Sequence, residues 1–499
     1  MLSHTISAIN QGLEVVRVEV EIQTIFGKPG FIIIGLANRV VAESRERITA
    51  ALVRCGVRLR PRKTIVNLAP ADLSKNTSSM ELAIAVALLQ LYGEIHMDLR
   101  RALFLGELSL DGQLRPMRGF LPILLRAREL GVKQVFFPRA NLPEAIALQG
   151  VELFPLRSLG EFLEGGRGTR PLRAAASTAT QAVAAPVSSI DLADICGQEQ
   201  AKRALLIAAA GGHNLLLFGR PGAGKSMLAQ GLLSILPQLS EEEFLEVNRL
   251  YSLAGLLQNG LLQQRPFRAP HHSISQTALI GGGSGQTIGE IVLAHRGILF
   301  MDELAQFSRQ TIELLRQPLE QATISIQRAH QHYTYPCDFT LLAAANPCPC
   351  GFSGSDQPCR CNPHQLQTYR SKFSGPLLDR IDLSLRVPPV AVQQIQSAKQ
   401  PVSPQLREQV EMAVARQQAR LGVGALKRNG RLSAPQVLHS CLLSSDARQL
   451  LNTAAQRLQL STRAYFKLIK IAQTISDLDQ AAQIHTEHVA EAFSLRESF

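Results

Sequence analysis

The sequence predicts an α/β protein of several domains, with a helix-covered parallel sheet between a mixed α/β region and a helical region. At 499 residues the chain is too long to fold around one hydrophobic core. Between residues 189 and 391, short apolar strands alternate with helical segments, as in a mostly parallel sheet. From residue 392 to 499 the spacing of apolar residues is helical only.

Residues 1–166 show the periods of both strands and helices. The stretch VVRVEVEIQ alternates apolar and charged residues as a half-buried strand does, whereas VVAESRERITAALVRCG and SMELAIAVALLQLYG have helical spacing. Asp111-Gly112 lies between two alternating runs and predicts a hairpin with a type I′ turn. The following residues, 167–188, are rich in small side chains and contain no acid, which predicts a linker.

The middle region is predicted to contain strands and helices, and the C-terminal region helices only. HNLLLFG, GILFMDE and FTLLAAAN are predicted strands, and KSMLAQGLLSIL and RQTIELLRQPLEQA are each predicted as one helix. Towards the C-terminus, DARQLLNTAAQRLQL and STRAYFKLIKIAQTISDL are predicted helices, and Ser461 is a plausible N-cap of the second.

The charge of the chain is strongly basic, with a formal net charge of +12. Residues 189–391 are balanced in charge, so the excess lies in the flanking regions. A basic surface suits a polyanion such as nucleic acid, although a merely soluble basic protein would have the same composition. Trp is absent and Tyr is scarce, so aromatic stacking on bases is not expected to dominate such a contact.

No segment of the sequence predicts a membrane or secretory destination. The longest uncharged apolar stretches fall well short of the roughly 20 residues of a spanning helix. The N-terminus lacks a basic region followed by an apolar one, so no secretory signal is expected. We therefore expect a cytoplasmic protein with reduced thiols and no membrane partner.

The stretch GRPGAGKS fits the pattern of a phosphate-binding loop and lies between a predicted strand and a predicted helix. Its glycines allow backbone N–H groups to wrap phosphates, Lys225 reaches the β- and γ-phosphates, and the Ser226 hydroxyl ligates Mg²⁺. ATP and Mg²⁺ are thus the expected ligands. The residues expected to contact them are Gly219, Arg220, Pro221, Gly222, Ala223, Gly224, Lys225 and Ser226.

The strand GILFMDEL predicts the acidic half of the same site. Asp302 at its C-terminal end is expected to hold the Mg²⁺ shell together with Ser226. Glu303 is expected to orient or deprotonate the attacking water. Alternatively, Asp302 and Glu303 are an ordinary acidic strand end without a role in catalysis.

Together with FTLLAAANP and SGPLLDRIDL, these motifs in this order resemble the AAA+ ATPases. PFRAPHHSISQTALIGGGSGQTIGEIVLAHRGILFMDEL is similar almost throughout to the magnesium-chelatase-like family, and the likeness covers essentially the whole chain. The resemblance implies a hexameric ring with ATP at subunit interfaces and a C-terminal helical lid. It also implies that Asn346 is sensor 1, Arg380 the arginine finger that reaches the neighbouring subunit, and Arg463 sensor 2 on the lid.

The N-terminal region resembles the proteolytic domain of Lon-type enzymes, which has a ribosomal-S5-type α/β fold. Ser78 falls where those enzymes carry a nucleophile, but the position of their catalytic lysine falls at about Leu121. Leucine cannot accept a proton, and the nearest downstream lysine, Lys133, lies in a different element. We therefore expect the fold without proteolysis and no protease substrate. The basic stretch Arg58–Lys63 is either a solvated surface or a strip that contacts phosphates.

Four cysteines lie close together in the sequence, at Cys348, Cys350, Cys359 and Cys361. Four thiolates on one turn-rich loop can satisfy a tetrahedral zinc ion, which would then be structural because no ligand position stays open. A redox switch and the absence of any joint role are the alternatives. The paired His271 and His272 are not expected to share a metal, because adjacent residues on a strand point to opposite faces.

Two functions remain open at this stage. The family resemblance implies a homo-hexameric ATPase that moves on single-stranded or branched DNA, a helicase promoting branch migration of recombination intermediates in natural transformation. The alternative is a chelatase-type motor that remodels a protein partner, because the same fold hosts many tasks.

Overall fold

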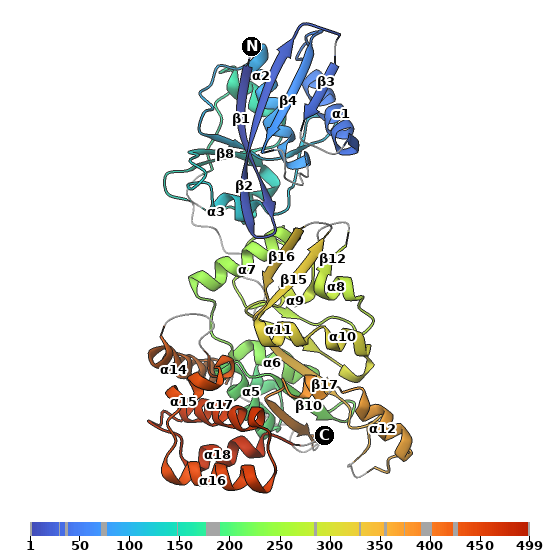
Figure 1. The fold of residues 1–499 in the computed structure, drawn as a ribbon. Helices are drawn as coiled ribbons and strands as arrows, with labels where there is room; N and C mark the ends of the chain where they lie inside the picture. Colours follow the sequence, from blue (N-terminus) through green and yellow to red (C-terminus); the bar gives the residue numbers. More distant parts are fainter. Residues whose placement is uncertain are drawn as a thin grey trace. The chain divides into compact units, whose positions relative to one another are not determined.

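The computed structural model describes residues 2–28, 30–34, 38–70, 77–146, 148–175, 190–283, 287–328, 331–353, 357–373, 375–390, 402–422 and 428–497. The chain forms two compact units, whose elements are labelled in Figure 1. The first comprises Met1–Val183 together with Asn248–Leu262, and the second comprises Ala184–Val247 together with Gln263–Phe499. The sequence had placed residues 248–262 in the middle domain. Residues 176–188 of the predicted linker lie outside the described residues.

The first unit is built on one mixed sheet of seven strands in the order β3-β4-β2-β1-β5-β8-β9. Strands β1, β2 and β4 pair antiparallel, and the remaining neighbours pair parallel. The strands are β1 (Leu2–Gln11), β2 (Glu14–Ile25), β3 (Gly30–Ile34), β4 (Lys63–Ala69), β5 (Ala102–Phe104), β8 (Gln134–Pro138) and β9 (Glu152–Leu156). The α-helices are α1 (Asn38–Arg54), α2 (Glu81–Tyr92), α3 (Phe120–Leu125) and α4 (Leu159–Gly166). The mixed α/β prediction for this region is therefore confirmed.

Helix α2 forms the centre of the first unit's core. Its sequence, ELAIAVALLQLY, is apolar on all sides, and all but one of its residues are buried. A helix of this kind has to be enclosed by other elements, and α2 packs against β1, β2 and α1. Its buried Glu81 is compensated by Arg47, at 2.6 Å, and by the Ser44 hydroxyl, at 2.8 Å.

The predicted hairpin around Asp111-Gly112 is present, but its turn type was predicted wrongly. Strands β6 (Glu107–Leu108) and β7 (Leu114–Arg115) pair antiparallel. Gly112 has a φ of +82°, whereas Asp111 is not among the residues with positive φ. A type I′ turn needs positive φ at both central residues. The N–H of Gly112 instead bonds to the carbonyl of Ser109, so that the glycine closes the turn rather than sitting at its centre.

Residues 248–262 belong to the first unit because of a buried polar contact around Ser252. The Ser252 hydroxyl donates to a Glu144 carboxylate oxygen at 2.6 Å and accepts from the N–H of Leu121 at 3.1 Å. Its carbonyl accepts from the N–H of Gly119 at 2.8 Å. Burial raises the pKa of Glu144 to about 7, against the opposing hydrogen bonds from Ser252 and Asn141. The spacing of residues in the sequence does not reveal this contact, in which the Ser252 hydroxyl both donates and accepts a hydrogen bond.

Leu121, at the position of the Lon-type lysine, is fully buried in this unit and offers no base. Ser78 lies in the short 3₁₀ turn Thr77–Met80, but its side chain is outside the described part of the chain. The Lon-like identity of the fold remains a prediction from the resemblance.

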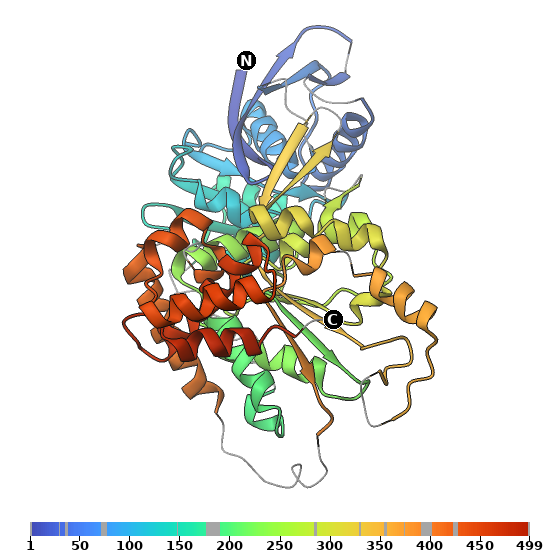
Figure 2. The ribbon, with the colours of Figure 1, turned by 60° about the horizontal axis from the view of Figure 1, so that its bottom comes forward.

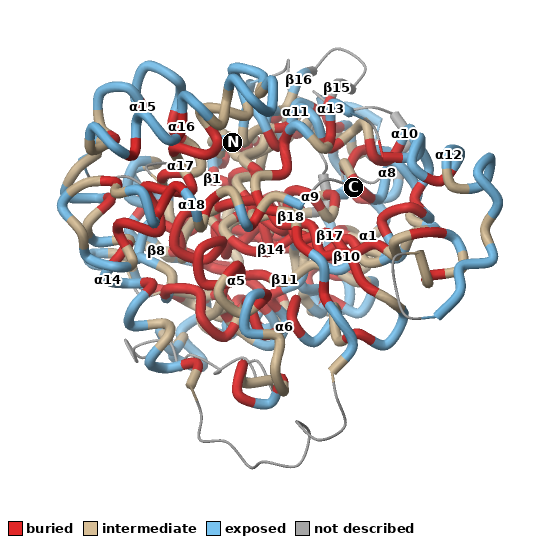
Figure 3. The backbone as a smooth tube through the Cα atoms, turned by 90° about the horizontal axis from the view of Figure 1, so that it is seen from below, coloured by how far each residue is buried: buried red, intermediate tan, exposed pale blue. Residues whose placement is uncertain are grey.

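The second unit is built on a parallel sheet of five strands in the order β11-β14-β17-β10-β18. The central strands are almost continuously buried, as Figure 3 shows. This confirms the predicted parallel sheet and explains the near-absence of polar residues in these strands. The strands are β10 (Leu215–Gly219), β11 (Phe267–Arg268), β14 (Ile298–Met301), β17 (Thr340–Ala345) and β18 (Leu383–Val387). Two separate ribbons pair β12 (Gly281–Gly282) with β13 (Thr287–Ile288) and β15 (Thr323–Arg328) with β16 (Gln331–Pro336).

Helices of the second unit surround the sheet and share one core with the C-terminal helices (Figure 2). Helices α14 and α17 pack against α5, and α14 also packs against α6. The helices before the C-terminal region are α5 (Glu199–Gly211), α6 (Lys225–Ile235), α7 (Glu241–Ala254, which runs on into the first unit), α8 (Gln276–Ile280), α9 (Glu290–Leu293), α10 (Arg309–Glu313), α11 (Arg316–Gln321), α12 (Pro363–Ser371) and α13 (Gly375–Leu378). Those of the C-terminal region are α14 (Ser403–Leu421), α15 (Ala434–Ser440), α16 (Ser445–Arg457), α17 (Thr462–Leu478) and α18 (Thr486–Ser494).

Two predictions about these helices have different outcomes. The Ser461 hydroxyl accepts from the N–H of Ala464 and caps α17, as expected. The single helix expected over residues 309–322 is wrong, because it is divided into α10 and α11. Pro318 has no N–H to bond the carbonyl of Leu314, and its ring would clash with that carbonyl in a regular helix, so the helical hydrogen bonding is interrupted between Glu313 and Arg316. Among the described residues, no helix combines the length and apolar character that crossing a bilayer requires.

Candidate functional site

The phosphate-binding loop links the C-terminal end of β10 to the first turn of α6. Gly222 and Gly224 have φ of +80° and +85°, and a side chain added at either would meet no atom within 4 Å. The loop is therefore open on the side where these residues lie, and its backbone N–H groups can approach a phosphate. The Lys225 ammonium donates to the carbonyls of Gly219 and Arg220 at 2.7 and 3.0 Å. Burial lowers the pKa of Lys225, and the nearby Asp302 and Glu303 oppose that shift.

The acidic residues predicted for the site lie beside this loop. The Ser226 hydroxyl donates to a carboxylate oxygen of Asp302 at 2.9 Å, so the two expected Mg²⁺ ligands are together. Glu303 has a φ of +50°, and its carboxylate accepts a hydrogen bond from Gln306 at 2.6 Å. These oxygen donors fit the preference of Mg²⁺ for hydroxyl and carboxylate ligands.

Asn346 completes the group from the end of β17. Its side-chain oxygen accepts from the Lys225 ammonium at 3.2 Å, which places it beside the position of a γ-phosphate. Its carbonyl accepts from the buried Tyr369 hydroxyl at 2.8 Å. Asn346 and Glu303 both line a cavity of about 420 Å³, together with Cys348, Tyr369 and Lys372. Water and a catalytic group from outside can thus approach the two residues from this cavity.

The four cysteines of the loop after Asn346 converge. Their sulfur atoms all lie within 4.8 Å of one another, close enough to hold one metal ion. The closest pairs are Cys348 with Cys350 at 3.3 Å, Cys350 with Cys359 at 3.5 Å and Cys348 with Cys359 at 3.8 Å. Tetrahedral ligation at about 2.3 Å requires sulfur atoms about 3.8 Å apart. The four cysteines therefore fit a metal ion. Residues 354–356 of the same loop lie outside the described part of the chain.

The cysteine loop also packs on the phosphate-binding loop, which the sequence did not reveal. The Arg220 guanidinium lies over the Phe352 ring at 5.1 Å from the centroid. A side chain added at Gly351 would come within 2.7 Å of a ring carbon of Pro221, so only glycine fits this approach. The cysteine loop is thus in contact with two parts of the nucleotide site, Asn346 at its start and Pro221 across the site.

Arg380 and Arg463 meet at a third residue, Glu320 of α11. Both guanidinium groups bond to the same carboxylate oxygen of Glu320, Arg463 at 2.8 Å. Arg380 is 9% exposed and also donates to the carbonyl of Pro376. Hydrogen bonds from Arg463 and the charge of Arg380 lower the pKa of Glu320, so the carboxylate is ionised between the two cations. Among the described residues, Arg380 forms its ion pair with Glu320 and not with Asp379 or Asp382, the acids near it in the sequence.

Arg380 and the phosphate-binding loop lie at opposite ends of the parallel strands of one sheet. Strands β10 and β18 are parallel and in register, with Leu215 opposite Leu383. Arg380 comes just before the start of β18, whereas the loop follows the end of β10. A strand rises about 3.3 Å per residue, so the length of β10 separates its two ends by about 13 Å. Arg380 is therefore out of reach of a phosphate bound by its own chain.

Helix α17 of the C-terminal region contacts the same end of the sheet as Arg380. The buried Lys467 donates to the carbonyl of Ile381 at 2.6 Å and lies 3.9 Å from Asp382. Burial lowers the pKa of Lys467 to about 8, and Asp382 opposes the shift. Arg463 lies one helical turn before Lys467 on α17, and although its side chain is 47% exposed it reaches the same carboxylate as Arg380.

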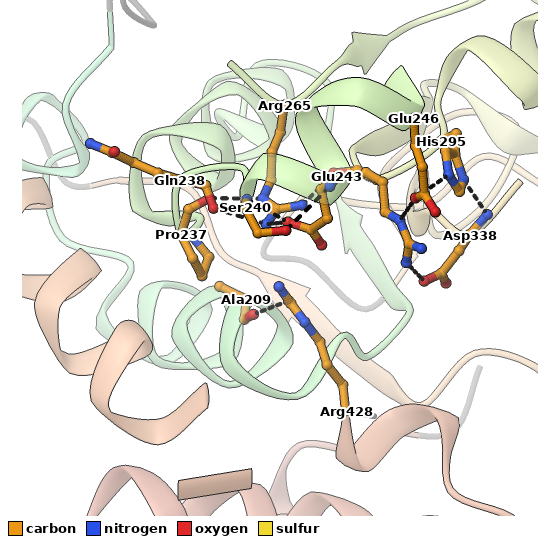
Figure 4. A network of polar contacts seen from close by, with 11 residues as sticks. Ala209, Pro237, Gln238, Ser240, Glu243, Glu246, Arg265, His295, Asp338 and Arg428 are labelled. Carbon is orange, nitrogen blue, oxygen red and sulfur yellow. Dashed lines mark hydrogen bonds and ion pairs between the residues drawn. The ribbon is translucent and has the colours of Figure 1, made fainter. Parts of the chain in front are cut away.

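A second polar network joins Arg428 of the C-terminal region to the core, as Figure 4 shows. The buried Arg265 donates to the carbonyl of Pro237 at 2.7 Å and to Glu243 at 2.6 Å. Arg428 donates to the carbonyl of Ala209 at 3.0 Å. Beside these, His295 accepts from the N–H of Asp338 and contacts Glu246 at 3.2 Å. These residues hold segments far apart in sequence, and none belongs to the nucleotide site.

His271 and His272 lie in a turn and not on a strand, so the expectation that their side chains point to opposite faces is wrong. The rings of His271 and His272 lie 4.0 Å apart, and His271 bonds to the Ser273 hydroxyl at 2.8 Å. Within the described ranges, the only group of three or more metal-binding side chains is the cysteine cluster.

Three functional contacts were not predicted: Glu320, Tyr369 and the stacking of Arg220 on Phe352. Each depends on residues that are distant in sequence, and Glu320 lies in QPLEQA, a stretch without any motif. The predicted residues Lys225, Ser226, Asp302, Glu303 and Asn346 do come together. Arg380 and Arg463 come together with each other instead.

Comparison with known families divides the chain in agreement with these features. Residues 191–395 match the family described as "Magnesium chelatase, subunit ChlI", residues 18–141 match "Subunit ChlI of Mg-chelatase", and residues 400–496 match its C-terminal part. The matched segments together span most of both units.

Individual relatives cover nearly the full length. The chain is 40% identical to the protein YifB of Salmonella typhimurium, over 99% of this chain and 96% of the relative. It is 37% identical to the competence protein ComM of Haemophilus influenzae, over 98% of this chain and 96% of the relative. A magnesium-chelatase 67 kDa subunit of Heliobacterium mobile is 26% identical over 34% of this chain and 30% of the relative. Full-length identity of this degree, with an AAA+ nucleotide site in place, means that the chain belongs to the magnesium-chelatase-like family of AAA+ ATPases that includes ComM and YifB.

Proposed function

We propose that this protein is an ATPase that works as a homo-hexameric ring and uses ATP hydrolysis to move on DNA, promoting branch migration of recombination intermediates in natural transformation. The competence protein among its relatives and the net charge of +12 support the DNA substrate. The proposed location is the cytoplasm, where such intermediates form.

The main support for a ring is that Arg380 and the phosphate-binding loop lie at opposite ends of the strands of the sheet. An arginine finger must touch the transferred phosphoryl group, and Arg380 cannot do so within its own chain. A neighbouring subunit can instead present it to the cavity beside Glu303 and Asn346. Because Arg463 shares Glu320 with Arg380, we assign both arginines to the neighbour's site.

The residues of one site then divide the work between two subunits. Lys225 and the loop N–H groups bind the phosphates, and Ser226 and Asp302 are the residues that would hold Mg²⁺. When bound, Mg²⁺ neutralises phosphate charge. Asn346 orients the attacking water and Glu303 accepts its proton. The neighbour's Arg380 stabilises the charge that develops on the phosphoryl oxygens.

The DNA substrate is tested by ATPase rates with and without single-stranded and branched DNA, at several salt concentrations. We expect stimulation by DNA that fades steeply as salt rises, since phosphate contacts release counterions. A matched assay with Lys225→Ala controls for contaminating ATPases. An ATPase rate that no DNA alters at any salt concentration would contradict the DNA motor and favour the protein-remodelling alternative.

We further propose that the four cysteines hold a structural zinc ion. Reduced thiols, four sulfur ligands and a spacing near that of a tetrahedral site support zinc over metals that prefer oxygen ligands, such as Mg²⁺ and Ca²⁺. Its role would be to fix the loop that contacts both Asn346 and Pro221.

Protein purified without chelator should contain about one equivalent of zinc per chain, measured by elemental analysis. The double variant Cys359→Ser/Cys361→Ser should lose this zinc and raise the KM for ATP. Cys55→Ser/Cys196→Ser removes two cysteines outside the cluster and should change neither quantity. Less than about half an equivalent in the unsubstituted protein would refute the zinc site.

A further inference from the structure

One end of the seven-stranded sheet in the first unit carries an exposed aromatic ring among cations. Ile25 at the end of β2 and Gly30 at the start of β3 both pair with Lys63 at the start of β4. The residues that precede Lys63 and those that connect Ile25 to Gly30 therefore lie at the same end of the sheet. We call Phe26, Lys28, Arg58, Arg60, Arg62 and Lys63 the basic tip.

Phe26 is held in the open rather than folded inwards. It is 88% exposed, and the Arg62 guanidinium lies 4.9 Å from its ring centroid. The arginine stacks on one face of the ring and restrains it. An exposure of 88% with one face stacked leaves the other face open to a flat partner.

The charge of the basic tip is unbalanced. Lys28, Arg58, Arg60 and Arg62 are exposed, and residues 22–34 and 54–66 contain no acidic residue. The nearest acid along β2, Glu21, accepts a hydrogen bond from Asn67 at 2.9 Å. Arg60 is fixed by a bond to the carbonyl of Tyr92 at 2.7 Å and by the ring of that residue. The basic tip is thus a site of positive charge in a defined position.

We propose that the basic tip binds single-stranded nucleic acid, with a base stacked on the open face of Phe26 and phosphates paired with the neighbouring cations. Stacking platforms beside a positive groove are the usual means of binding single strands without sequence preference. Duplex bases are already stacked on each other, so Phe26 favours a single strand. This inference rests on the proposed DNA function and adds to it a contact outside the ATPase core.

The test measures binding of the full-length protein to fluorescein-labelled dT20 without nucleotide, between about 50 and 200 mM salt. Phe26→Ala should weaken binding between about fivefold and a hundredfold, with an unchanged salt dependence, because no charge is lost. Arg58→Gln/Arg62→Gln should reduce the salt slope by about 1.4, at about 0.7 for each phosphate contact on a single strand. Arg100→Gln/Arg126→Gln removes two exposed cations elsewhere in the unit and should leave both quantities unchanged.

The outcomes separate this inference from the proposed function. If the unsubstituted protein binds dT20 and DNA stimulates its ATPase, but the basic-tip variants bind as well as it does, only the basic tip is refuted. If the unsubstituted protein shows no DNA binding or stimulation, the proposed function falls as well. Equal losses of dT20 and duplex affinity in Phe26→Ala would refute base stacking, and binding to anionic vesicles in place of DNA would refute the nucleic-acid assignment.

Discussion

Replacing Arg380 by alanine is expected to lower ATP hydrolysis by about 10³-fold or more while ATP binding stays nearly intact. Arg380 lies at the opposite end of the strands from the phosphate-binding loop of its own chain and is bonded to Glu320 instead. Its loss should therefore not disturb that loop directly. Hydrolysis is measured under saturating ATP, and binding by a fluorescent nucleotide analogue. Arg448→Ala, an exposed arginine on α16, is the matched control and should retain full activity.

A mixing experiment shows which subunit the arginine serves. Lys225→Ala chains lack the phosphate contact but keep Arg380, and Arg380→Ala chains have the reverse defect. Each alone should be inactive, whereas a mixture should recover part of the activity wherever an intact loop faces an intact arginine. Absence of any recovery in mixed rings, or full turnover by the Arg380→Ala protein, would disprove the assignment in trans.

Replacing Glu303 by glutamine is expected to slow hydrolysis by about 10²- to 10⁴-fold and to trap bound ATP. Glutamine has nearly the same size and can keep the contact with Gln306, but it cannot accept a proton from water. Single-turnover hydrolysis and retention of labelled ATP on the protein measure the two effects.

The control is Glu313→Gln on α10, which removes a half-buried carboxylate paired with Arg316. It should hydrolyse ATP at the unsubstituted rate. If Glu303→Gln retains that rate as well, the base must be another group, and the acidic strand end at Asp302-Glu303 would serve only the metal.

The parts of this protein that the sequence predicted are those encoded locally. The phosphate-binding loop needs glycines, a lysine and a hydroxyl within eight residues, and strand period places Asp302 and Asn346 at strand ends. The structure adds that these two strands are neighbours. The cysteine cluster is similarly local. In each case the chain has little freedom to arrange such close neighbours differently.

The contacts that escaped prediction join residues far apart in the chain. Glu320 meets Arg380 60 residues later and Arg463 143 residues later, and neither separation carries a period or motif. Ser252 fixes residues 248–262 to the first unit through Glu144, 108 residues earlier. Local errors had local causes, since Pro318, in the first turn of α11, interrupts the helical hydrogen bonds that apolar spacing alone would have continued from α10.

The carboxylate of Glu320 has a consequence for how the enzyme responds to its own abundance. In a solitary chain this one carboxylate binds both guanidinium groups, and Arg380 lies out of reach of that chain's own phosphate-binding loop. Turnover per molecule should therefore climb steeply with protein concentration and vanish on dilution. A cell that makes few copies would then lose no ATP to idle, unassembled molecules.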